Sequence, residues 1–381
     1  MRVRGAVLRE AGLPPPYAES RPLELCELEL APPGPGELLV RIRAAGLCHS
    51  DLSAIDGSRP RALPMVVGHE AAGEIVALGD DVDDLEPGDH VVLTFVPTCG
   101  SCPFCLQGRV ALCEPGAEAN ASGTLLSGAR RFSTPDGEVL NHHLGVSGFA
   151  EHVVVSRASA VWIDPGLPFE IAALFGCAVL TGVGAAIHTA GIVEGDRVAV
   201  FGLGGVGLAA LLGARLAGAS QLVAVDIISE KLELALELGA TDVVPADEHA
   251  VERVRALTGG GAERVLETVG NERVLAQAYA ATRRGGTTVT VGLPHPDRQL
   301  TIQAVSLVTE ERTLRGSYLG SCVPSRDVPR FVAWHAEGRL PVEALLTHRL
   351  PVEELNEGFD RLARGEAVRQ VVVFPPASAR V

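Results

Sequence analysis

The sequence has almost no lysine, no extended basic run and no long apolar run. Lys231 is its only lysine, and 32 basic residues against 47 acidic ones give a formal net charge of −15. Such a surface would repel polyphosphate, so we expect no nucleic-acid partner. The apolar stretches break well before the roughly 18 residues of a membrane span, and the N-terminus lacks the apolar segment of a secretion signal. These absences predict a cytoplasmic protein without a membrane partner.

Cysteine is the residue whose placement is most informative. Four of the eight cysteines lie between Cys99 and Cys113. In a chain without a secretion signal, such a cluster favours metal binding over disulfides. The length of 381 residues predicts two or three domains, at roughly 100–200 residues each.

The expected secondary structure changes near the middle of the chain. Up to about Val155 it reads as short β segments between Gly and Pro, and the Gly-, Ser- and Thr-rich segment 118–141 suggests an inserted surface loop. From Asp196 to Gly292, expected strands and helices alternate, which predicts a doubly wound parallel sheet. The expected strands there are Val198–Phe201, Gln221–Asp226, Arg264–Thr268 and Thr287–Gly292, and the helices are Gly205–Gly218, Glu230–Leu238 and Arg273–Thr282.

A glycine motif, GLGGVG, follows the first of these expected strands and opens the first helix. On its own such a motif is as readily a glycine-rich turn, but a strand before it and a helix after it are the context of a dinucleotide site. The glycines permit a tight turn and close approach of the backbone to a pyrophosphate, and the helix N-terminus attracts its charge. The predicted cofactor-binding residues are Gly202, Gly204, Gly205, Val206 and Gly207.

Asp226 stands at the end of the second expected strand, where a carboxylate binds both adenosine ribose hydroxyls and repels a 2′-phosphate. This position favours NAD over NADP. Asp226 could instead cap the next helix, but Ser229 is better placed for that role. Lys231, five residues on, is either an ordinary solvated charge or a ribose contact.

The cysteine cluster has the spacing C-x2-C-x2-C-x7-C, which lets four thiolates close around one structural zinc ion. An iron–sulfur cluster is the alternative, but the ferredoxin pattern has a shorter last spacing. The predicted ligands are Cys99, Cys102, Cys105 and Cys113.

A second, dispersed set consists of Cys48, His69 and Cys177. Each alone could be an ordinary core residue. Together they make the Cys₂His set of a catalytic zinc that keeps its fourth position for water or substrate. Asp51 and Glu70 are candidate carboxylates behind these ligands.

These motifs resemble the zinc-containing alcohol dehydrogenases of the medium-chain dehydrogenase/reductase superfamily, especially the long, liver-type forms. The likeness runs almost end to end, through CHSD, GHEAAG, CGSCPFC, GCAVLTGVGAA, GLGGVG, VAVD, NEGFD and VRQVVVF. It implies a mostly β, GroES-like catalytic domain, 1–178 plus 322–381, and a Rossmann domain, 179–321. It also implies two zinc ions per chain and a homodimer.

The resemblance assigns further roles. Ser50 would hydrogen-bond the substrate oxygen and accept its proton, while Thr181, Val206 and Val291 would hold the nicotinamide for hydride transfer between alcohol and NAD. His49 and Arg369 would contact the pyrophosphate. The substrate pocket would include Phe95, His143, Leu144 and Tyr318.

Two positions depart from the family pattern. Ser53 occupies the place of a histidine that passes the proton to solvent in many members, so the relay would run through water. Ala117 stands where glutathione-dependent members carry a basic residue, which argues against a glutathione adduct as substrate.

Two other functions are compatible with a similar fold. A zinc-independent enone or quinone reductase on the same scaffold needs no Cys48, His69 and Cys177 set. A binding protein that kept the fold and lost catalysis would have no use for an open metal site or for Ser50. The complete ligand set therefore favours the dehydrogenase.

Overall fold

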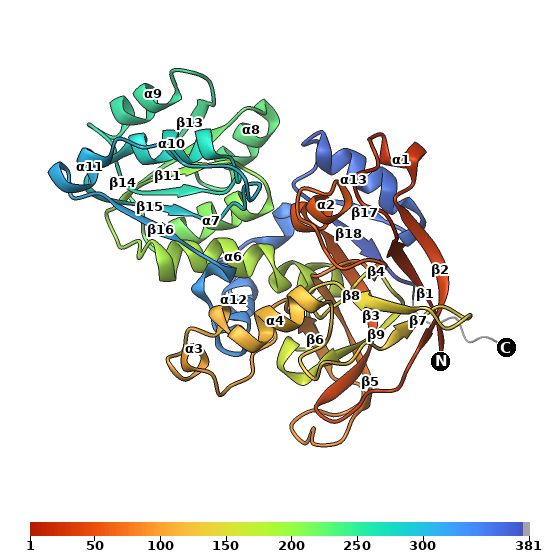
Figure 1. The fold of residues 1–381 in the computed structure, drawn as a ribbon. Coiled ribbons are helices and arrows are strands. Elements are labelled where there is room, and N and C mark those ends of the chain that lie inside the picture. The colour runs from red at the N-terminus through yellow and green to blue at the C-terminus, as the bar shows by residue number, and fades with distance from the viewer. Residues whose placement is uncertain (376–381) are drawn as a thin grey trace. The chain divides into compact units, whose positions relative to one another are not determined.

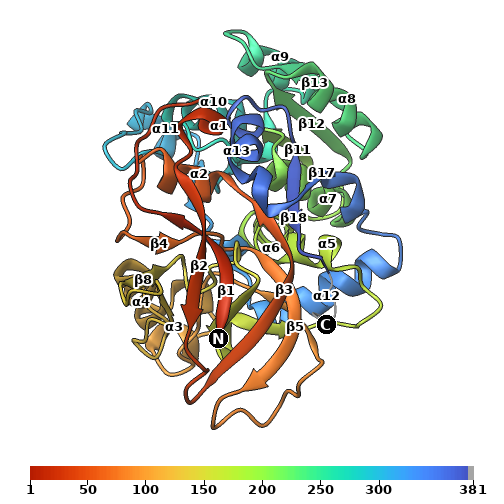
Figure 2. The same ribbon diagram turned by 90° about the vertical axis from the view of Figure 1, so that its right-hand side faces the viewer.

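The computed structural model describes residues 1–375, which form two compact units (Figures 1 and 2). The first unit contains Met1–Cys177, Val323–Val332 and residues 346–375. The second contains Ala178–Cys322 and Ala333–Leu345. Helix α12 (Pro324–Ala336) therefore begins in one unit and ends in the other. Residues 333–345 lie with the second unit, whereas the sequence placed them in the catalytic domain.

The first unit is built on two β structures. A closed barrel has the order β1-β2-β7-β8-β4, and a seven-stranded sheet has the order β10-β6-β5-β3-β18-β17 with β9 paired to β3. The barrel strands are β1 (Arg2–Leu8), β2 (Leu23–Leu30), β4 (Met65–Val66), β7 (Phe132–Ser133) and β8 (Val139–His142). The sheet strands are β3 (Glu37–Leu47), β5 (Ala71–Leu78), β6 (His90–Leu93), β9 (His152–Ser156), β10 (Ala160–Trp162), β17 (Leu346–Leu350) and β18 (Arg369–Val373).

Strand β3 shows why this sequence forms the sheet. Val40 and Ile42 are buried, while Arg41 between them and Arg43 after them are partly exposed, which is the period of two expected for a strand. The strand pairs with β5, β9 and β18, all antiparallel. Its last residues carry the chain directly to Cys48.

The prediction that segment 118–141 is an inserted surface loop was wrong. The end of α4 and the strands β7 and β8 lie in it, and both strands belong to the barrel. Leu125, Phe132 and Leu140 are fully buried there. These few apolar residues are spread among Gly, Ser and Thr, so the segment looks polar although it contributes to the core.

The helices of the first unit are short. They are α1 (Tyr17–Ser20), α2 (His49–Ile55), α3 (Pro103–Leu106), α4 (Glu114–Ser122), α5 (Phe169–Ala172) and α13 (Leu355–Ala363). Single turns of tighter helix are η1 (Val110–Leu112), η2 (Arg157–Ser159), η3 (Ala173–Gly176) and η7 (Val352–Glu354).

The second unit contains the predicted doubly wound sheet. Its six strands are parallel and have the order β13-β12-β11-β14-β15-β16. This is the order 3-2-1-4-5-6, which reverses between the first and fourth strands. The strands are β11 (Arg197–Phe201), β12 (Gln221–Asp226), β13 (Asp242–Pro245), β14 (Ala262–Glu267), β15 (Thr282–Thr290) and β16 (Thr313–Gly316).

Helices alternate with these strands, as Figure 1 shows. They are α6 (Ala178–Gly184), α7 (Gly205–Leu216), α8 (Ser229–Glu237), α9 (Ala250–Leu257), α10 (Glu272–Ala281) and α11 (Ala304–Thr309), with the shorter turns η4 (Ala185–Thr189), η5 (Leu319–Ser321) and η6 (Val342–Leu345). Ser229 does not cap α8: the N-cap is Ile228, and the Ser229 hydroxyl donates to Glu230.

The core of the second unit lies between the sheet and its helices. Phe201 of β11 and Val225 of β12 are about 1% exposed, and Val254 of α9 is fully buried in the same cluster. Strands buried on both faces read as continuous apolar runs, which is why β11 and β12 were readily predicted.

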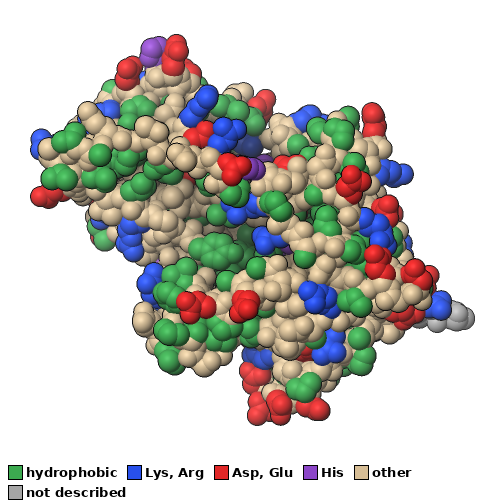
Figure 3. Space-filling model, in the orientation of Figure 1, with side chains coloured by type: hydrophobic (Ala, Val, Ile, Leu, Met, Phe, Trp, Pro, Cys, Tyr) green, Lys and Arg blue, Asp and Glu red, His purple; other side chains and the backbone are tan. Residues whose placement is uncertain are grey.

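The described surface carries charges of both signs. On the face drawn in Figure 3, acidic and basic side chains are interspersed. Among residues 1–375, no single helix is long and apolar enough to cross a membrane. One bent pair, Phe169–Gly176 with Ala178–Thr189, meets the requirement of length and composition together.

Candidate metal centre and cofactor site

The dispersed ligand set comes together in the first unit. Cys48 follows β3, His69 and Glu70 precede β5, and Cys177 follows η3. The candidate ligand atoms of these four residues lie within 4.8 Å of one another. Residues separated by up to 129 positions in the sequence therefore meet at one point, because β3 and β5 are antiparallel neighbours and η3 packs against both of them.

The His69 imidazole is oriented for a metal. Its Nδ1 lies 2.8 Å from Asp51 Oδ1, while its buried Nε2 has no hydrogen-bond partner among the described residues. A zinc-ligating histidine characteristically donates its other ring nitrogen to a carboxylate. The orphaned Nε2 beside two thiols is therefore a donor set that fits Zn²⁺.

Asp51 holds more than this one ligand. Its Oδ2 accepts the backbone N–H of Cys48 at 3.1 Å, so one carboxylate positions two of the candidate metal ligands. The ring of His143 also approaches it, with Nδ1 3.1 Å from Oδ1. Asp51, His69 and His143 are all at most 1% exposed. The spacing of residues in the sequence gave no sign that His143 reaches Asp51.

Glu70, the residue after His69, forms a buried ion pair with Arg369. The guanidinium Nη2 lies 3.1 Å from Glu70 Oε2, and Nη1 donates to the Leu47 carbonyl at 3.1 Å. Burial raises the pKa of Glu70 to about 7, although Arg369 acts in the opposite direction. The pyrophosphate role expected for Arg369 stays a prediction.

The surroundings of Cys48 favour the thiolate form of its side chain. A hydrogen bond from the Cys177 thiol, helped by His69 and Arg369, outweighs burial and holds the pKa of Cys48 well below its usual range. A thiol must lose its proton to ligate a metal, so this environment prepares Cys48 as a thiolate.

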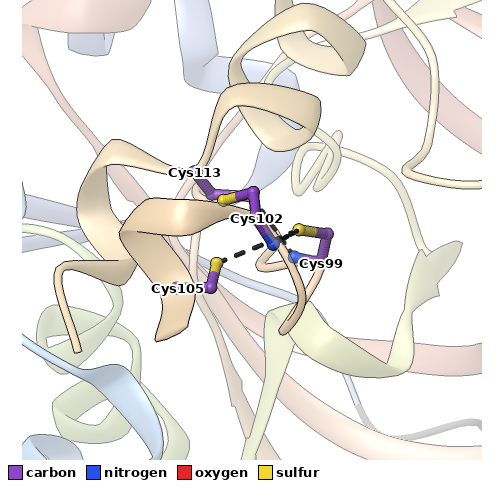
Figure 4. Close-up of side chains that lie close together, drawn as sticks. All are labelled: Cys99, Cys102, Cys105 and Cys113. Atoms are coloured by element: carbon purple, nitrogen blue, oxygen red, sulfur yellow. Dashed lines mark hydrogen bonds between the residues drawn. The ribbon is translucent and has the colours of Figure 1, made fainter. Parts of the chain in front are cut away.

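The four-cysteine lobe closes on itself within 15 residues of chain (Figure 4). Its four Sγ atoms lie within 4.8 Å of one another. Backbone N–H groups of Ser101 and Cys102 lower the pKa of Cys99 to about 6, and the Cys102 N–H reaches its sulfur at 3.2 Å. Four convergent sulfurs with no fifth ligand in the group fit a closed tetrahedral zinc site.

The glycine motif has the conformation that a dinucleotide site needs. Gly202 follows β11 with φ of 91°, a left-handed value that favours glycine. A Cβ on Gly207 would collide with the Gly202 carbonyl oxygen. Helix α7 begins at Gly205, so its free N–H groups lie at the turn, where they can bind a phosphate.

Asp226 ends β12 beside this turn. Its Oδ2 accepts the backbone N–H of Leu203 at 2.6 Å, and its Oδ1 accepts that of Ile228 at 3.0 Å. Each oxygen keeps a lone pair that can accept a further hydrogen bond. Lys231 is half-buried on α8, and burial lowers its pKa while Asp226 acts to raise it.

Comparison with known proteins bears on this pair of sites. Residues 34–165 match the alcohol dehydrogenase GroES-like domain, and residues 205–337 match the zinc-binding dehydrogenase domain. The putative alcohol dehydrogenase D of Mycobacterium tuberculosis is 39% identical, over 98% of this chain and 100% of its own length. The chain belongs to the zinc-binding alcohol dehydrogenase family. It is an oxidoreductase with the predicted GroES-like and Rossmann-like folds.

Two other relatives of this alcohol dehydrogenase cover nearly all of it. The S-(hydroxymethyl)glutathione dehydrogenase of Paracoccus denitrificans is 35% identical, over 98% of this chain and 100% of its own length. The solved structure of an alcohol dehydrogenase zinc-binding domain protein from Burkholderia ambifaria is 35% identical, with a TM-score of 0.92. The match covers 99% of this chain and 100% of that one.

The remaining predicted residues of the dehydrogenase are divided between the units. On α2, Ser50 is half-buried and His49 is exposed. Phe95 follows β6, and Leu144 follows β8. The Phe95 ring packs edge-on against His69, with 5.4 Å between ring centroids. In the second unit the predicted contacts are Thr181 on α6, Val206 on α7, Val291 after β15 and the exposed Tyr318.

Proposed function

We propose that this protein transfers hydride between a small-molecule alcohol and NAD, with two zinc ions bound per chain. The observation that carries the proposal is the His69 ring, oriented by Asp51 with its Nε2 unpartnered beside Cys48 and Cys177. A bound zinc ion supplies Lewis-acid stabilisation of the alcohol oxygen.

The residues around this centre would divide the remaining work. Ser50, two residues after Cys48, would hydrogen-bond the substrate hydroxyl and accept its proton. Asp51 would keep His69 and the Cys48 backbone fixed, and the Glu70–Arg369 pair would adjust the charge behind the ligands. These buried carboxylates do not need to react. They act by orientation and by field, which is the usual part of the protein in such chemistry.

The preference for NAD rests on Asp226. Both of its oxygens face the glycine turn and the start of α8, where an adenosine ribose would lie. A 2′-phosphate there would bring negative charge onto a carboxylate. No Arg lies among residues 221–231 to accommodate that phosphate, and Lys231 would serve the ribose. We therefore assign NAD as the cofactor.

The substrate is proposed to be an alcohol or aldehyde other than a glutathione adduct. Ala117 lies on α4, immediately after the cysteine lobe, and offers no positive charge to a glutathione carboxylate. The Paracoccus relative is named for a glutathione adduct. We propose that this chain differs from it in substrate because of Ala117. Phe95, His143, Leu144 and Tyr318 are the proposed pocket residues.

A homodimer is proposed from the free edge of the second unit's sheet. Strand β16 is the last strand of that sheet, and the neighbouring helix α11 exposes Val305 and Val308 at 55% and 79%. A second copy pairing along β16 would cover both the strand edge and these apolar side chains.

The free cysteines fit a reducing compartment, for which we propose the cytoplasm.

The test is a direct spectrophotometric assay of cofactor reduction. Purified protein is given NAD or NADP with a panel of primary, secondary, aromatic and terpenoid alcohols and with S-(hydroxymethyl)glutathione, and reduced cofactor is followed by absorbance. We expect NAD reduction with some simple alcohols and little with the glutathione adduct. NADP preference would contradict the cofactor assignment, and exclusive use of the adduct would contradict the substrate assignment. Activity that survives removal of zinc would favour the zinc-independent reductase.

A further inference from the structure

Glu267 is a buried carboxylate to which the sequence assigned no role. It is the last residue of β14, at the carboxyl edge of the parallel sheet, and its exposure is 1%. Among residues 1–375, no arginine, lysine or histidine forms an ion pair with it. A buried charge without an ion-pair partner is costly unless hydrogen bonds satisfy it. Its contacts therefore show what it stabilises.

The Glu267 carboxylate binds the turn after β14 and the last residue of the neighbouring strand β15. Its Oε1 accepts the backbone N–H groups of Val269 and Gly270, each at 2.7 Å. Its Oε2 accepts the Thr290 hydroxyl at 2.7 Å, at the end of the neighbouring strand β15. The backbone carbonyl of Glu267 also accepts the Val291 N–H at 2.8 Å. One residue thus fixes the turn after β14 and the turn after β15.

These two turns pack directly on each other. A Cβ on Gly292 would collide with the backbone of Gly270, so the turns approach more closely than side chains would permit. On the other side, the Thr268 hydroxyl donates to the Gly202 carbonyl at 2.9 Å, which joins β14 to the glycine turn. The ends of β11, β14 and β15 are therefore held as one unit by Glu267 and Thr268.

The position of this unit determines which part of NAD it would meet. With the adenosine ribose at the end of β12 and the pyrophosphate at the glycine turn, the cofactor crosses the point where the strand order reverses, between β11 and β14. The nicotinamide half then lies over the ends of β14 and β15. Those are the two turns that Glu267 holds, and Val291 lies on the second.

We infer that Glu267 is a positioning residue for the nicotinamide half of the cofactor, acting through turns 268–270 and 290–292. The inference rests on the proposed NAD site and goes beyond it, because no predicted cofactor contact includes this residue. Glu267 itself touches backbone and Thr290, and it need not touch the cofactor. Its effect is to fix in advance the shape of the turns that the nicotinamide contacts, which reduces the entropy lost on binding.

The test compares binding of NAD with binding of ADP-ribose, which lacks the nicotinamide. Affinities are measured by calorimetry on the full-length, zinc-loaded protein. Glu267→Ala leaves the partly buried N–H groups of Val269 and Gly270 without their acceptor, so we expect NAD affinity to fall about tenfold or more while ADP-ribose affinity stays within about twofold. Glu267→Gln keeps an oxygen for both N–H groups and an amide that donates to Thr290, so it should restore NAD affinity to within about threefold of wild type.

Three comparison variants make the result specific. Thr290→Val removes one of the three side-chain hydrogen bonds and should weaken NAD binding about threefold without affecting ADP-ribose, which keeps the test open if Glu267→Ala does not fold. Glu237→Ala, an exposed change on α8, should alter neither affinity. Asp226→Ala should weaken both ligands.

Equal loss of NAD and ADP-ribose affinity in Glu267→Ala would overturn the inference, because it would make Glu267 a general support of the fold. Unchanged NAD affinity in Glu267→Ala, or in Thr290→Val, would overturn it as well. If wild type binds neither ligand, or if Asp226→Ala has no effect, the proposed cofactor site itself is wrong. That outcome is distinct, since it does not depend on any Glu267 variant.

Discussion

Asp51 Oδ1 lies 2.8 Å from His69 Nδ1, and both side chains are buried. In Asp51→Asn only one oxygen remains, so the side chain can accept from His69 or from the Cys48 N–H but not from both with the present geometry. The amide NH₂ would then face the other donor. Loss of such an outer partner typically lowers metal affinity about 10- to 100-fold, and we expect that range here. Competition with a chromogenic chelator measures it. Asp56→Asn, an exposed change just after the same helix, is the control, and equal zinc retention in both variants would contradict the assignment.

The cysteine lobe and the dispersed ligands should behave as two independent zinc sites. We expect two zinc ions per chain in wild type, and one in both Cys102→Ser and Cys177→Ala. Cys102→Ser should lower the thermal midpoint more, because a closed structural site contributes directly to folding. Cys177→Ala should abolish turnover with a smaller effect on stability. Elemental analysis and calorimetry test both statements, and one zinc or any iron in wild type would contradict them.

Asp226 should determine the choice between NAD and NADP. In Asp226→Gly the ribose loses its acceptor and the Leu203 N–H loses its partner, so we expect KM for NAD to rise about tenfold or more. The same change removes the repulsion of a 2′-phosphate, so KM for NADP should fall. Steady-state kinetics with both cofactors measure the ratio. Glu248→Ala, an exposed change in the same unit, should leave the ratio unchanged. A wild type that already prefers NADP would refute the prediction.

His142 should make the protein sensitive to acid. Burial lowers the pKa of His142 to about 3, and its Nε2 accepts the Arg131 N–H at 3.1 Å, which requires an unprotonated nitrogen. In the unfolded chain the pKa is about 6.5, so between these values the unfolded state binds more protons. Stability therefore falls as pH decreases through that window, by at most about 1.4 kcal/mol per pH unit from this residue.

His142→Gln removes the titrating group and keeps an oxygen that can accept the Arg131 N–H. We expect the difference in unfolding free energy between wild type and His142→Gln to shrink as pH falls from about 7 to about 4. Urea denaturation at several pH values measures this difference, in which acid effects on the metal ligands are common to both proteins. A difference that is constant with pH would show that His142 acts through packing alone.

How much the sequence could predict depended on how far apart the interacting residues lie. The lobe from Cys99 to Cys113 is local, so its spacing alone indicated a metal. The turn from Gly202 to Gly207 is local too, and together with the strand expected before it and the helix expected after it, it indicated a dinucleotide. The predicted ends of α7, α8 and β15 missed by one to five residues, because tertiary contacts decide where an element stops.

Two features of the site gave weaker signals or none. His143 reaches Asp51 only because the barrel brings the end of β8 there, and no local pattern encodes that meeting. Glu267 did leave a trace, since a glutamate directly follows the apolar pair Val265 and Leu266 at the end of the expected strand. That trace does not reveal which backbone groups its carboxylate accepts, since both turns must be folded before they can be identified.

Ser53 is the departure from the family pattern with the sharpest kinetic consequence. It lies half-buried on α2, five residues after Cys48, where many members carry a relay histidine. A serine hydroxyl has no useful basicity near neutral pH, so water or buffer must take the proton from Ser50. General-base assistance is typically worth about 10²- to 10⁴-fold when the proton moves in the transition state, but the loss here should be far smaller because Ser50 still handles the proton nearest the substrate.

We therefore expect Ser53→His to raise alcohol oxidation modestly at about pH 6 to 7 and hardly at all at high pH, where hydroxide already removes the proton quickly. The pH profile of kcat for both proteins tests this, and deuterated alcohol shows whether hydride transfer masks the effect. Ser53→Asn is the matched control, since it adds a polar side chain without a base and should leave the profile unchanged. If Ser53→His and Ser53→Asn change kcat equally at every pH, Ser53 acts through packing and the proton does not pass this position.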